Sequence, residues 1–332
     1  MPGHMLIDAY DTALFDLDGV IYLGPDPIPG APEAIAGLRK HGKPVMFVTN
    51  NAARPSGQVA AQLTALGVDA AEADVVTSAQ AGARMLAEEL PAGSKVLVVG
   101  TENLADQVRA VGMDVVSKAD ERPDAIIQGY DPQLSWPRLD EAALAVQAGA
   151  RWFACNLDKT RPTNRGLVPG AGAAIYAVGL TVRTEPMVAG KPFRPLLREA
   201  ILRTGAKHPI FVGDRLDTDI VGAHNASMDS LMVFTGAHGK LDLVAATPPE
   251  RPTYIGSNVQ ALLGAPRVAE VGTEQATCGG AVARLADGSI VLDAIPGTLE
   301  GQLDALWAIA NLAWANPEAE TVHVLGQLTE VR

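Results

Sequence analysis

The sequence predicts an α/β fold, in which a Rossmann-like core with a parallel sheet is interrupted by a second α/β domain and followed by an α+β extension. Short apolar runs alternate with helical segments over residues 12–77, and this alternation indicates a parallel sheet. The alternation continues over residues 78–182 with different side-chain chemistry, and the first pattern then resumes. A sheet that starts, pauses and resumes is one domain with another inserted into it. We therefore expect a core of residues 1–77 and 183–264, an inserted domain of 78–182 and an extension of 265–332.

The first core segment begins with the apolar run 13–15, which is typical of a buried strand. A helix is predicted over residues 31–40, where a proline suits the first turn. The run 44–48 has the length and composition of a buried parallel strand, and Pro55 opens a second helix that closes near Gly67. Two strands separated by a helix imply a right-handed crossover and a parallel sheet.

The inserted domain repeats this pattern. Strands are predicted over residues 95–100, 125–129 and 152–155, with helices between them and a loop over 156–169. None of these strands ends in an Asp-x-Asp pair. The insertion is therefore a second α/β unit with its own chemistry.

The core resumes after the insertion. Gly190-Lys191-Pro192 is interpreted as the start of a helix that runs to about residue 203. Apolar runs over 209–212, 230–234 and 254–255 predict three further strands, with a helix after the first of them. These strands would complete the sheet that residues 13–15 begin.

The extension has a different pattern. Two runs, 281–285 and 290–294, flank an Asp-Gly turn and predict a hairpin. Apolar residues then recur at helical spacing, namely Leu299, Leu303, Leu306, Ala310, Ala313 and Trp314. We see no acid, His or Cys cluster with catalytic spacing here, so packing or dimerisation is the expected role. The candidate partners of the apolar stripe are the core of the same chain and the extension of a second chain.

Composition limits the classes of function. The chain has 332 residues, of which 48% are hydrophobic, and a formal net charge of −12. This charge argues against nucleic acid and anionic membranes as partners, and an anionic substrate would need local cations or a bound metal. We see no apolar run of membrane-spanning length and no signal-peptide pattern. Cys155 and Cys278 are the only cysteines, so a reducing cytoplasm is the expected location.

Polar side chains follow the predicted strands. Asp16 and Asp18 come directly after the first strand, and side chains at i and i+2 of a strand point to the same face. Ligands of open α/β sheets bind at the carboxyl edge, where these side chains would lie. Further polar signatures are Thr49-Asn50-Asn51 after the second strand, Lys191 before a helix, and Asp214 with Asp219 after a later strand.

Together these groups fit phosphoryl transfer from a phosphate monoester. Asp16 would attack phosphorus and form an aspartyl-phosphate, and Asp18 would protonate the leaving alkoxide and later take a proton from water. Asp16, Asp214 and a backbone carbonyl near Asp18 could hold Mg²⁺, which screens the dianion. Lys191, Thr49 and backbone N–H groups would hold the equatorial oxygens.

Each signature has a simpler reading when it stands alone. The acids after the first strand could be a solvated strand end, and Thr49-Asn50-Asn51 could be an N-cap and turn. Gly190-Lys191-Pro192 could be a plain helix start, and Asp214 and Asp219 could cap the next helix. Their coincidence at four element ends, in this order, favours the catalytic interpretation.

These four motifs resemble those of the haloacid dehalogenase superfamily of phosphatases. The insertion is similar in position and size to the large α/β (C2-type) cap of the subgroup that contains 4-nitrophenylphosphatase and phosphoglycolate/glycerol-3-phosphate phosphatase. The resemblance covers residues 12 to about 262 and says nothing about the extension. It implies that Asp16 is the nucleophile and Asp18 the general acid/base, and that Asp16, Asp18 through its carbonyl, and Asp214 bind Mg²⁺. Asp219 would support the metal shell through water.

The other expected site residues surround this centre. Thr49, Asn50 and Lys191 would act in catalysis, and Gly19 and Asn51 would help to bind substrate. Parts of the insertion, such as Gly129-Tyr130-Asp131, also resemble the subgroup's cap signatures. A closing cap excludes bulk water and contacts the leaving group, so specificity is expected in its loops. The candidate cap residues are Tyr130, Asp131, Asn156, Asp158, Arg161 and Arg165.

The sequence thus predicts a cytoplasmic, Mg²⁺-dependent phosphatase of small phosphorylated metabolites, with glycerol 3-phosphate as the favoured substrate. The alternatives of the same class are a phosphoglycolate phosphatase and a broad-specificity 4-nitrophenylphosphatase or nucleotidase. A non-enzymatic alternative is a phosphometabolite-binding protein. A homodimer is a candidate assembly. An Asn156/Asp158 pair would suit a small polyol or hydroxy-acid leaving group, although Asn156-x-Asp158 could equally shape a turn.

Overall fold

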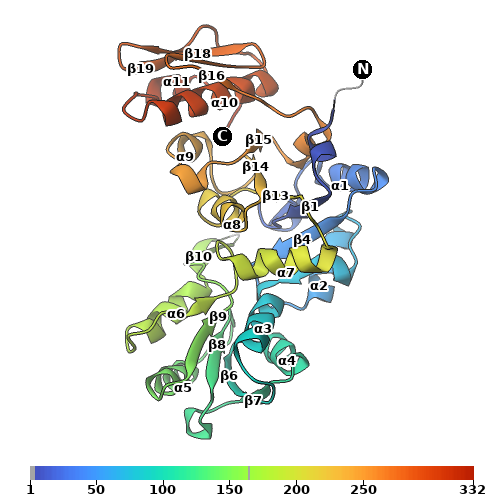
Figure 1. Ribbon diagram of the computed structural model, residues 1–332, viewed down its shortest axis with the longest axis vertical. Helices are drawn as coiled ribbons and strands as arrows, with labels where there is room; N and C mark the ends of the chain where they lie inside the picture. The colour runs from blue at the N-terminus through green and yellow to red at the C-terminus, as the bar shows by residue number, and fades with distance from the viewer. Residues whose placement is uncertain (1–3, 164) are drawn as a thin grey trace. The chain divides into compact units, whose positions relative to one another are not determined.

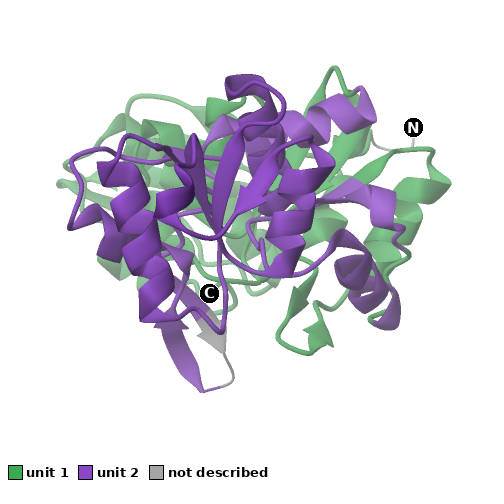
Figure 2. Cartoon of the chain, turned by 90° about the horizontal axis from the view of Figure 1, so that it is seen from below, with its two compact units in different colours: residues 1–45, 66–69, 206–332 green, residues 46–65, 70–205 purple. Residues whose placement is uncertain are grey.

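The computed structural model describes residues 4–163 and 165–332. The chain divides into two compact units (Figure 2). Unit 1 comprises Met1–Val45, Leu66–Asp69 and Ala206–Arg332, and unit 2 comprises Met46–Ala65 and Ala70–Gly205. This division does not test the boundaries that the sequence suggests for a core, an insertion and an extension, so these boundaries stay a prediction.

Unit 1 contains a parallel sheet with the predicted strands. β1 (Thr12–Phe15) pairs with β13 (Pro209–Gly213), β13 with β14 (Asp229–Val233), and β14 with β15 (Tyr254–Gly256), all in parallel. β1 and β13 are buried along their whole length, as continuous apolar strands of parallel sheets are. The structure therefore confirms a parallel-sheet α/β core.

Helices and a small hairpin complete this part of unit 1. α1 (Ala31–Lys40) has the residue range that the sequence predicts, with a proline in its first turn and basic residues in its last turn. The other elements are the antiparallel pair β2 (Tyr22–Leu23) and β3 (Asp26–Pro27), and the short helices α8 (Val221–Asn225) and α9 (Lys240–Val244).

The extension also belongs to unit 1 and is richer than the expected hairpin and helix. β18 (Ala281–Ala286) and β19 (Ser289–Leu292) form the hairpin. Two more strands, β16 (Glu270–Val271) and β17 (Gln275–Cys278), extend it into an antiparallel sheet of four. α10 (Leu299–Ala315) lies along this sheet (Figure 1), and α11 (Val322–Gly326) follows it.

The apolar stripe of α10 is buried inside its own chain. Leu303, Leu306 and Ala310 are 0% exposed and share one apolar cluster with Met232 and Leu243 of the core. This burial identifies the core of the same chain as the partner of the stripe. The stripe therefore gives no support to a dimer interface.

Unit 2 contains a second α/β arrangement of strands and helices. A parallel sheet has the strand order β12-β9-β8-β6-β7. α3 and α4 pack on one side of its central strands, and α5 and α6 on the other (Figure 1). Its elements are α3 (Ser78–Glu89), β6 (Lys95–Val99), α4 (Glu102–Ala110), β7 (Asp114–Val116), β8 (Ala125–Gln128), α5 (Trp136–Gln147), β9 (Arg151–Ala154), α6 (Ala171–Gly179) and β12 (Met187–Val188).

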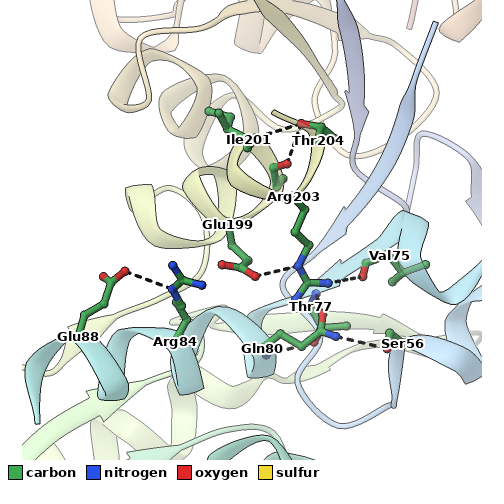
Figure 3. A network of polar contacts seen from close by, with 11 residues as sticks. Ser56, Val75, Thr77, Gln80, Arg84, Glu88, Glu199, Ile201, Arg203 and Thr204 are labelled. Atoms are coloured by element: carbon green, nitrogen blue, oxygen red, sulfur yellow. Dashed lines mark hydrogen bonds and ion pairs between the residues drawn. The ribbon is translucent and has the colours of Figure 1, made fainter. Parts of the chain in front are cut away.

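Unit 2 also holds two parallel strands that do not belong to this sheet. β4 (Val45–Thr49) pairs with β5 (Val75–Thr77), and α2 (Ser56–Ala65) lies between them in the chain. A network of polar contacts ties β5 to α3 and to α7 (Arg194–Thr204), as Figure 3 shows. The Arg203 guanidinium donates to Glu199 at 2.8 Å and to the Val75 carbonyl at 3.4 Å.

Two local predictions differ from the structure. The helix expected to start at Gly190 is α7, which begins at Arg194, because the proline that opens its first turn is Pro195. The segment expected to be a loop over 156–169 contains the antiparallel pair β10 (Thr160–Thr163) and β11 (Gly166–Pro169). Asn164, which that loop includes, lies outside the described residues.

Among the described residues, the structure contains no helix that is long and apolar enough to cross a membrane.

Candidate active site

Three carboxylates meet at the carboxyl edge of the unit 1 sheet. Asp16 follows β1, and Asp214 and Asp219 follow β13, the strand that pairs with β1. Each offers an oxygen within 4.8 Å of an oxygen of the other two. Asp214 and Asp219 are buried, and buried like charges repel strongly unless a cation neutralises them. The donor set therefore fits a small divalent cation that prefers oxygen ligands, such as Mg²⁺.

Asp219 is turned back toward the strand end by a single π-helical turn, Leu216–Ile220. Its Oδ2 accepts hydrogen bonds from the backbone N–H groups of Asp214 at 3.2 Å and Arg215 at 3.1 Å. Gly213 permits this approach, because a Cβ there would lie 2.2 Å from the Cβ of Asp219. Asp219 thus fixes the backbone that presents Asp214.

The Asp214 carboxylate is enclosed by backbone. The Ala237 N–H donates to its Oδ2 at 2.5 Å. A Cβ would lie 2.5 Å from this oxygen if placed on Gly19, and 1.9 Å from it if placed on Gly236. The Thr235 hydroxyl donates to the Gly19 carbonyl and joins the two sides of the enclosure. We call residues 234–239, between β14 and α9, the Asp214 loop. No motif in the sequence pointed to this loop.

Asp16 and Asp18 are placed as the strand periodicity predicts. Leu17 between them is 0% exposed, whereas Asp16 is half-buried and Asp18 is exposed. Gly19 follows with φ +83°, in the left-handed region that favours glycine, and its N–H donates to the Tyr22 carbonyl at 2.8 Å. The chain therefore turns directly after the two acids, which leaves Asp18 accessible to solvent and to a ligand.

Unit 2 brings four other predicted residues together. The Asn50 side chain donates to Asp158 Oδ1 and to the Lys191 carbonyl, each at 3.1 Å, and accepts from the Lys191 N–H at 2.8 Å. The Asn156 amide donates to the Asn50 carbonyl at 2.6 Å. Lys191 and Asn156 are each 3% exposed. Asn50 therefore connects the second motif, the third motif and the candidate cap pair.

Two of these residues also shape turns. The Asp158 N–H donates to Asn156 Oδ1 at 3.0 Å, as in an Asx turn, and Asp158 also contacts Asn50. The interpretation of Asn156 and Asp158 as a substrate-binding pair stays a prediction. Asn51 Oδ1 accepts from the Ala53 and Arg54 N–H groups at 2.8 and 3.2 Å. The side chain of Asn51 thus orders the turn before α2. Thr49, which is 4% exposed, accepts from the Asn51 N–H at 3.1 Å.

The remaining candidate cap residues lie in unit 2. The Arg161 guanidinium carbon is 5.0 Å from the centroid of the Tyr130 ring, which is a cation–π geometry. Asp131 Oδ1 accepts from the Gln133 N–H at 2.8 Å and orders a turn. Arg165 is exposed directly before β11. Arg161 and Tyr130 therefore form an aromatic–cation pair within unit 2.

The predicted residues thus fall into two groups. Asp16, Asp18, Asp214 and Asp219 belong to unit 1, and the residues around Asn50 belong to unit 2. The expectation that both groups act on one substrate stays a prediction.

This fold and carboxylate cluster define a hydrolase class. The sequence model of the haloacid dehalogenase-like hydrolases matches residues 13–114, and a second HAD-hydrolase-like model matches residues 188–262. The chain belongs to this family. It is 47% identical over 253 residues to the D-glycerol 3-phosphate phosphatase of Mycobacterium tuberculosis, a match that covers 76% of this chain and 71% of that protein.

Solved structures are similar in fold. The crystal structure of a glycerol phosphate phosphatase from Mycobacterium tuberculosis in complex with magnesium has a TM-score of 0.87 and 39% identity, and the match covers 98% of both chains. A 4-nitrophenylphosphatase from Thermotoga maritima has a TM-score of 0.73 and 29% identity, and covers 79% of this chain. The first of these therefore has a counterpart of the extension. An acid sugar phosphatase of Staphylococcus saprophyticus is 36% identical, over 74% of this chain and 93% of its own length.

Proposed function

We propose that this protein is a Mg²⁺-dependent phosphatase of small phosphate monoesters, with glycerol 3-phosphate as the preferred substrate. The observation that carries the proposal is the cluster of Asp16, Asp214 and Asp219 at the carboxyl edge of the sheet. The similarity to a D-glycerol 3-phosphate phosphatase supports the choice of substrate. Asp16 and Asp214 would hold the metal ion directly, together with the carbonyl of Asp18, and Asp219 would support them. The bound metal would neutralise charge on the phosphate oxygens.

The chain's own residues would carry the two chemical steps. An Asp16 oxygen forms a bond to phosphorus while the ester P–O bond breaks, and Asp18 gives its proton to the departing alkoxide. Asp18 then takes a proton from water, whose oxygen attacks phosphorus and releases phosphate from Asp16. Lys191 and Thr49 would hold the phosphate oxygens, and Asn50 orients Lys191 through the two backbone bonds described above.

The leaving group would be recognised by unit 2. Asp158 and the pair Arg161/Tyr130 offer a carboxylate and a cation to a small polyol, whereas Asn156 is buried and acts through Asn50. Gly19, Asn51, Asp131 and Arg165 would complete the substrate site. We place the enzyme in the cytoplasm, because Cys155 and Cys278 are both free thiols. If a homodimer forms, it would use a surface other than the α10 stripe.

The nucleophile is tested by Asp16→Asn, which keeps the size of the side chain but removes its charge. Phosphate release from glycerol 3-phosphate should fall by several orders of magnitude. The matched control is Asp26→Asn, an exposed aspartate of β3, which should keep wild-type turnover. A retained kcat above about a tenth of wild type, a barrier change below about 1.4 kcal/mol, would exclude the covalent mechanism. A phosphometabolite-binding protein would release no phosphate even as wild type with Mg²⁺.

Specificity is tested by a panel of phosphate monoesters and by Arg161→Ala. This variant should lower kcat/KM for glycerol 3-phosphate more than for 4-nitrophenyl phosphate, because nitrophenolate leaves readily without help from the protein. The control is Arg151→Ala, since the Arg151 guanidinium carbon lies 5.4 Å from the Phe153 ring centroid in the same unit. Equal losses for both substrates would assign Arg161 to folding. Higher kcat/KM for 2-phosphoglycolate, or similar values for all esters, would favour the two alternative phosphatases.

A further inference from the structure

The Asp214 loop is held from the side opposite Asp214 by an arm of the extension, residues 328–332. The Arg332 guanidinium donates through Nη1 to the Gly236 carbonyl. The main-chain oxygen of Arg332 accepts from the Lys240 N–H at 2.8 Å. The Lys240 ammonium donates to the carbonyls of Leu328 at 2.5 Å and Val331 at 2.7 Å. The arm thus binds both to the Asp214 loop and to Lys240, the first residue of α9, which follows the loop.

The arm is itself firmly anchored. Leu328 is 0% exposed and Val331 is 3% exposed, and both belong to the apolar cluster that joins the extension to the core. The Glu330 N–H donates at 2.8 Å to Oε1 of Gln302, a side chain of α10 that is 3% exposed. A continuous chain of contacts therefore runs from α10 through the arm to the Asp214 loop.

The loop has little freedom to move without moving the Asp214 carboxylate. Gly236 lies so close that a Cβ there would be 1.9 Å from Asp214 Oδ2, and the neighbouring Ala237 N–H donates to the same oxygen at 2.5 Å. The Gly236 carbonyl, which Arg332 binds, is in the peptide group that carries the Ala237 N–H. A displacement of this one peptide group therefore also moves the donor to Asp214 Oδ2.

We infer that the arm positions Asp214 for Mg²⁺, and that Arg332 is a positioning residue of the active site. The inference rests on the proposed function, which makes Asp214 a metal ligand. Without the Arg332 hydrogen bond, the peptide group between Gly236 and Ala237 loses its outer restraint, and the donor to Asp214 Oδ2 is no longer fixed. Mg²⁺ tolerates only small departures from octahedral geometry at about 2.0–2.1 Å, so its affinity should respond to such a loss.

The experiment is a calorimetric titration of Mg²⁺ into the full-length protein without substrate. Arg332→Ala should raise the Kd for Mg²⁺ by about three- to tenfold, which corresponds to the net contribution of one ordinary hydrogen bond. Arg332→Lys keeps a donor and should recover part of this loss. The matched control is Arg284→Ala, an arginine of the same extension that is paired to Asp293 at 2.8 Å. It should leave the Kd unchanged.

A second variant removes a different hydrogen-bond donor to the arm. Lys240→Met removes the donor to Leu328 and Val331, and it should also weaken Mg²⁺ binding. The double variant with Arg332→Ala should lose less than the product of the two single effects, because both act through one arm. A wild-type Kd in Arg332→Ala protein with a native circular dichroism spectrum would overturn the inference, as would an equal loss in Arg284→Ala. Failure of the wild-type protein itself to bind Mg²⁺ would instead refute the proposed function.

Discussion

Gly19→Ala isolates the close contact between the first motif and Asp214. Gly19 has φ +83°, and a Cβ there would lie 2.5 Å from Asp214 Oδ2 and 2.9 Å from the Gly236 Cα. Gly24→Ala is a matched control, because Gly24 has φ +61° and a Cβ on it would meet no heavy atom within 4 Å. Both substitutions impose a left-handed conformation on alanine, but only the first meets the carboxylate.

The magnitudes follow from these geometries. The left-handed conformation costs an L-residue about 1–2 kcal/mol, so both variants should lose roughly this much free energy of unfolding. In Gly19→Ala the carboxylate must also retreat from 2.5 Å to the 3.4 Å of an ordinary contact. A displacement of about 1 Å in a reacting geometry can lower the rate about 100-fold. We therefore expect kcat/KM to fall by about two orders of magnitude in Gly19→Ala alone.

The assay is phosphate release from glycerol 3-phosphate over a range of Mg²⁺ concentrations, with thermal melting of each variant beside it. Gly24→Ala should melt earlier and keep near-wild-type kcat/KM. Gly19→Ala should in addition require more Mg²⁺ for half-maximal rate. If both variants keep kcat/KM within about twofold of wild type, the inference that activity requires glycine at position 19, because a side chain there would displace the Asp214 carboxylate, is wrong.

Three further predictions concern thiols, packing and pH. Burial raises the pKa of Cys155 to about 12 and that of Cys278 to about 11, so neither thiol should react with Ellman's reagent at about pH 8 until the protein is unfolded. Leu306→Ala, at a side chain that is 0% exposed, should lower the free energy of unfolding by about 2–5 kcal/mol in a melt, whereas Leu299→Ala, at 38% exposure, should cost far less. Burial tends to raise the pKa of Asp11, but hydrogen bonds from the Lys207 and His208 N–H groups outweigh it and hold the pKa below 3.8. Asp11 therefore stabilises the fold above about pH 3.8 and loses this effect as the pH falls through its lowered folded pKa, so Asp11→Asn should destabilise the protein at about pH 7 and progressively less as the pH falls below about 3.8.

The sequence predicted the strands that carry the candidate catalytic residues, because each is an apolar run that ends in polar residues. Asp16 and Asp214 are placed correctly at strand ends for this reason, and the structure shows that these two strands pair. Two shorter strands are not predicted from the sequence. β5 has three residues and β12 has two, too few for a periodic pattern to separate them from a loop.

The Asp214 loop was missed for a different physical reason. Its contributions are a backbone N–H from Ala237 and the absence of a side chain at Gly236, and neither has a signature in sequence. Thr235-Gly236-Ala237 reads as an ordinary turn. The α10 stripe was found because its period is helical, but its partners, such as Met232 and Leu243, lie far away in the chain. Patterns within one segment identify what must be buried and do not identify what buries it.

A chain that ends at residue 264 tests how the extension contributes to the site. From sequence alone it should keep its activity, since the extension has no residue of the four motifs. The structure adds two consequences: the cluster shared with Leu216 and Ile255 is uncovered, and the arm that holds the Asp214 loop is lost. The shortened chain should therefore melt earlier and need more Mg²⁺ for half-maximal phosphate release, with turnover recovering at saturating Mg²⁺. An unchanged melt and an unchanged Mg²⁺ dependence would mean that the extension neither stabilises the core nor positions Asp214.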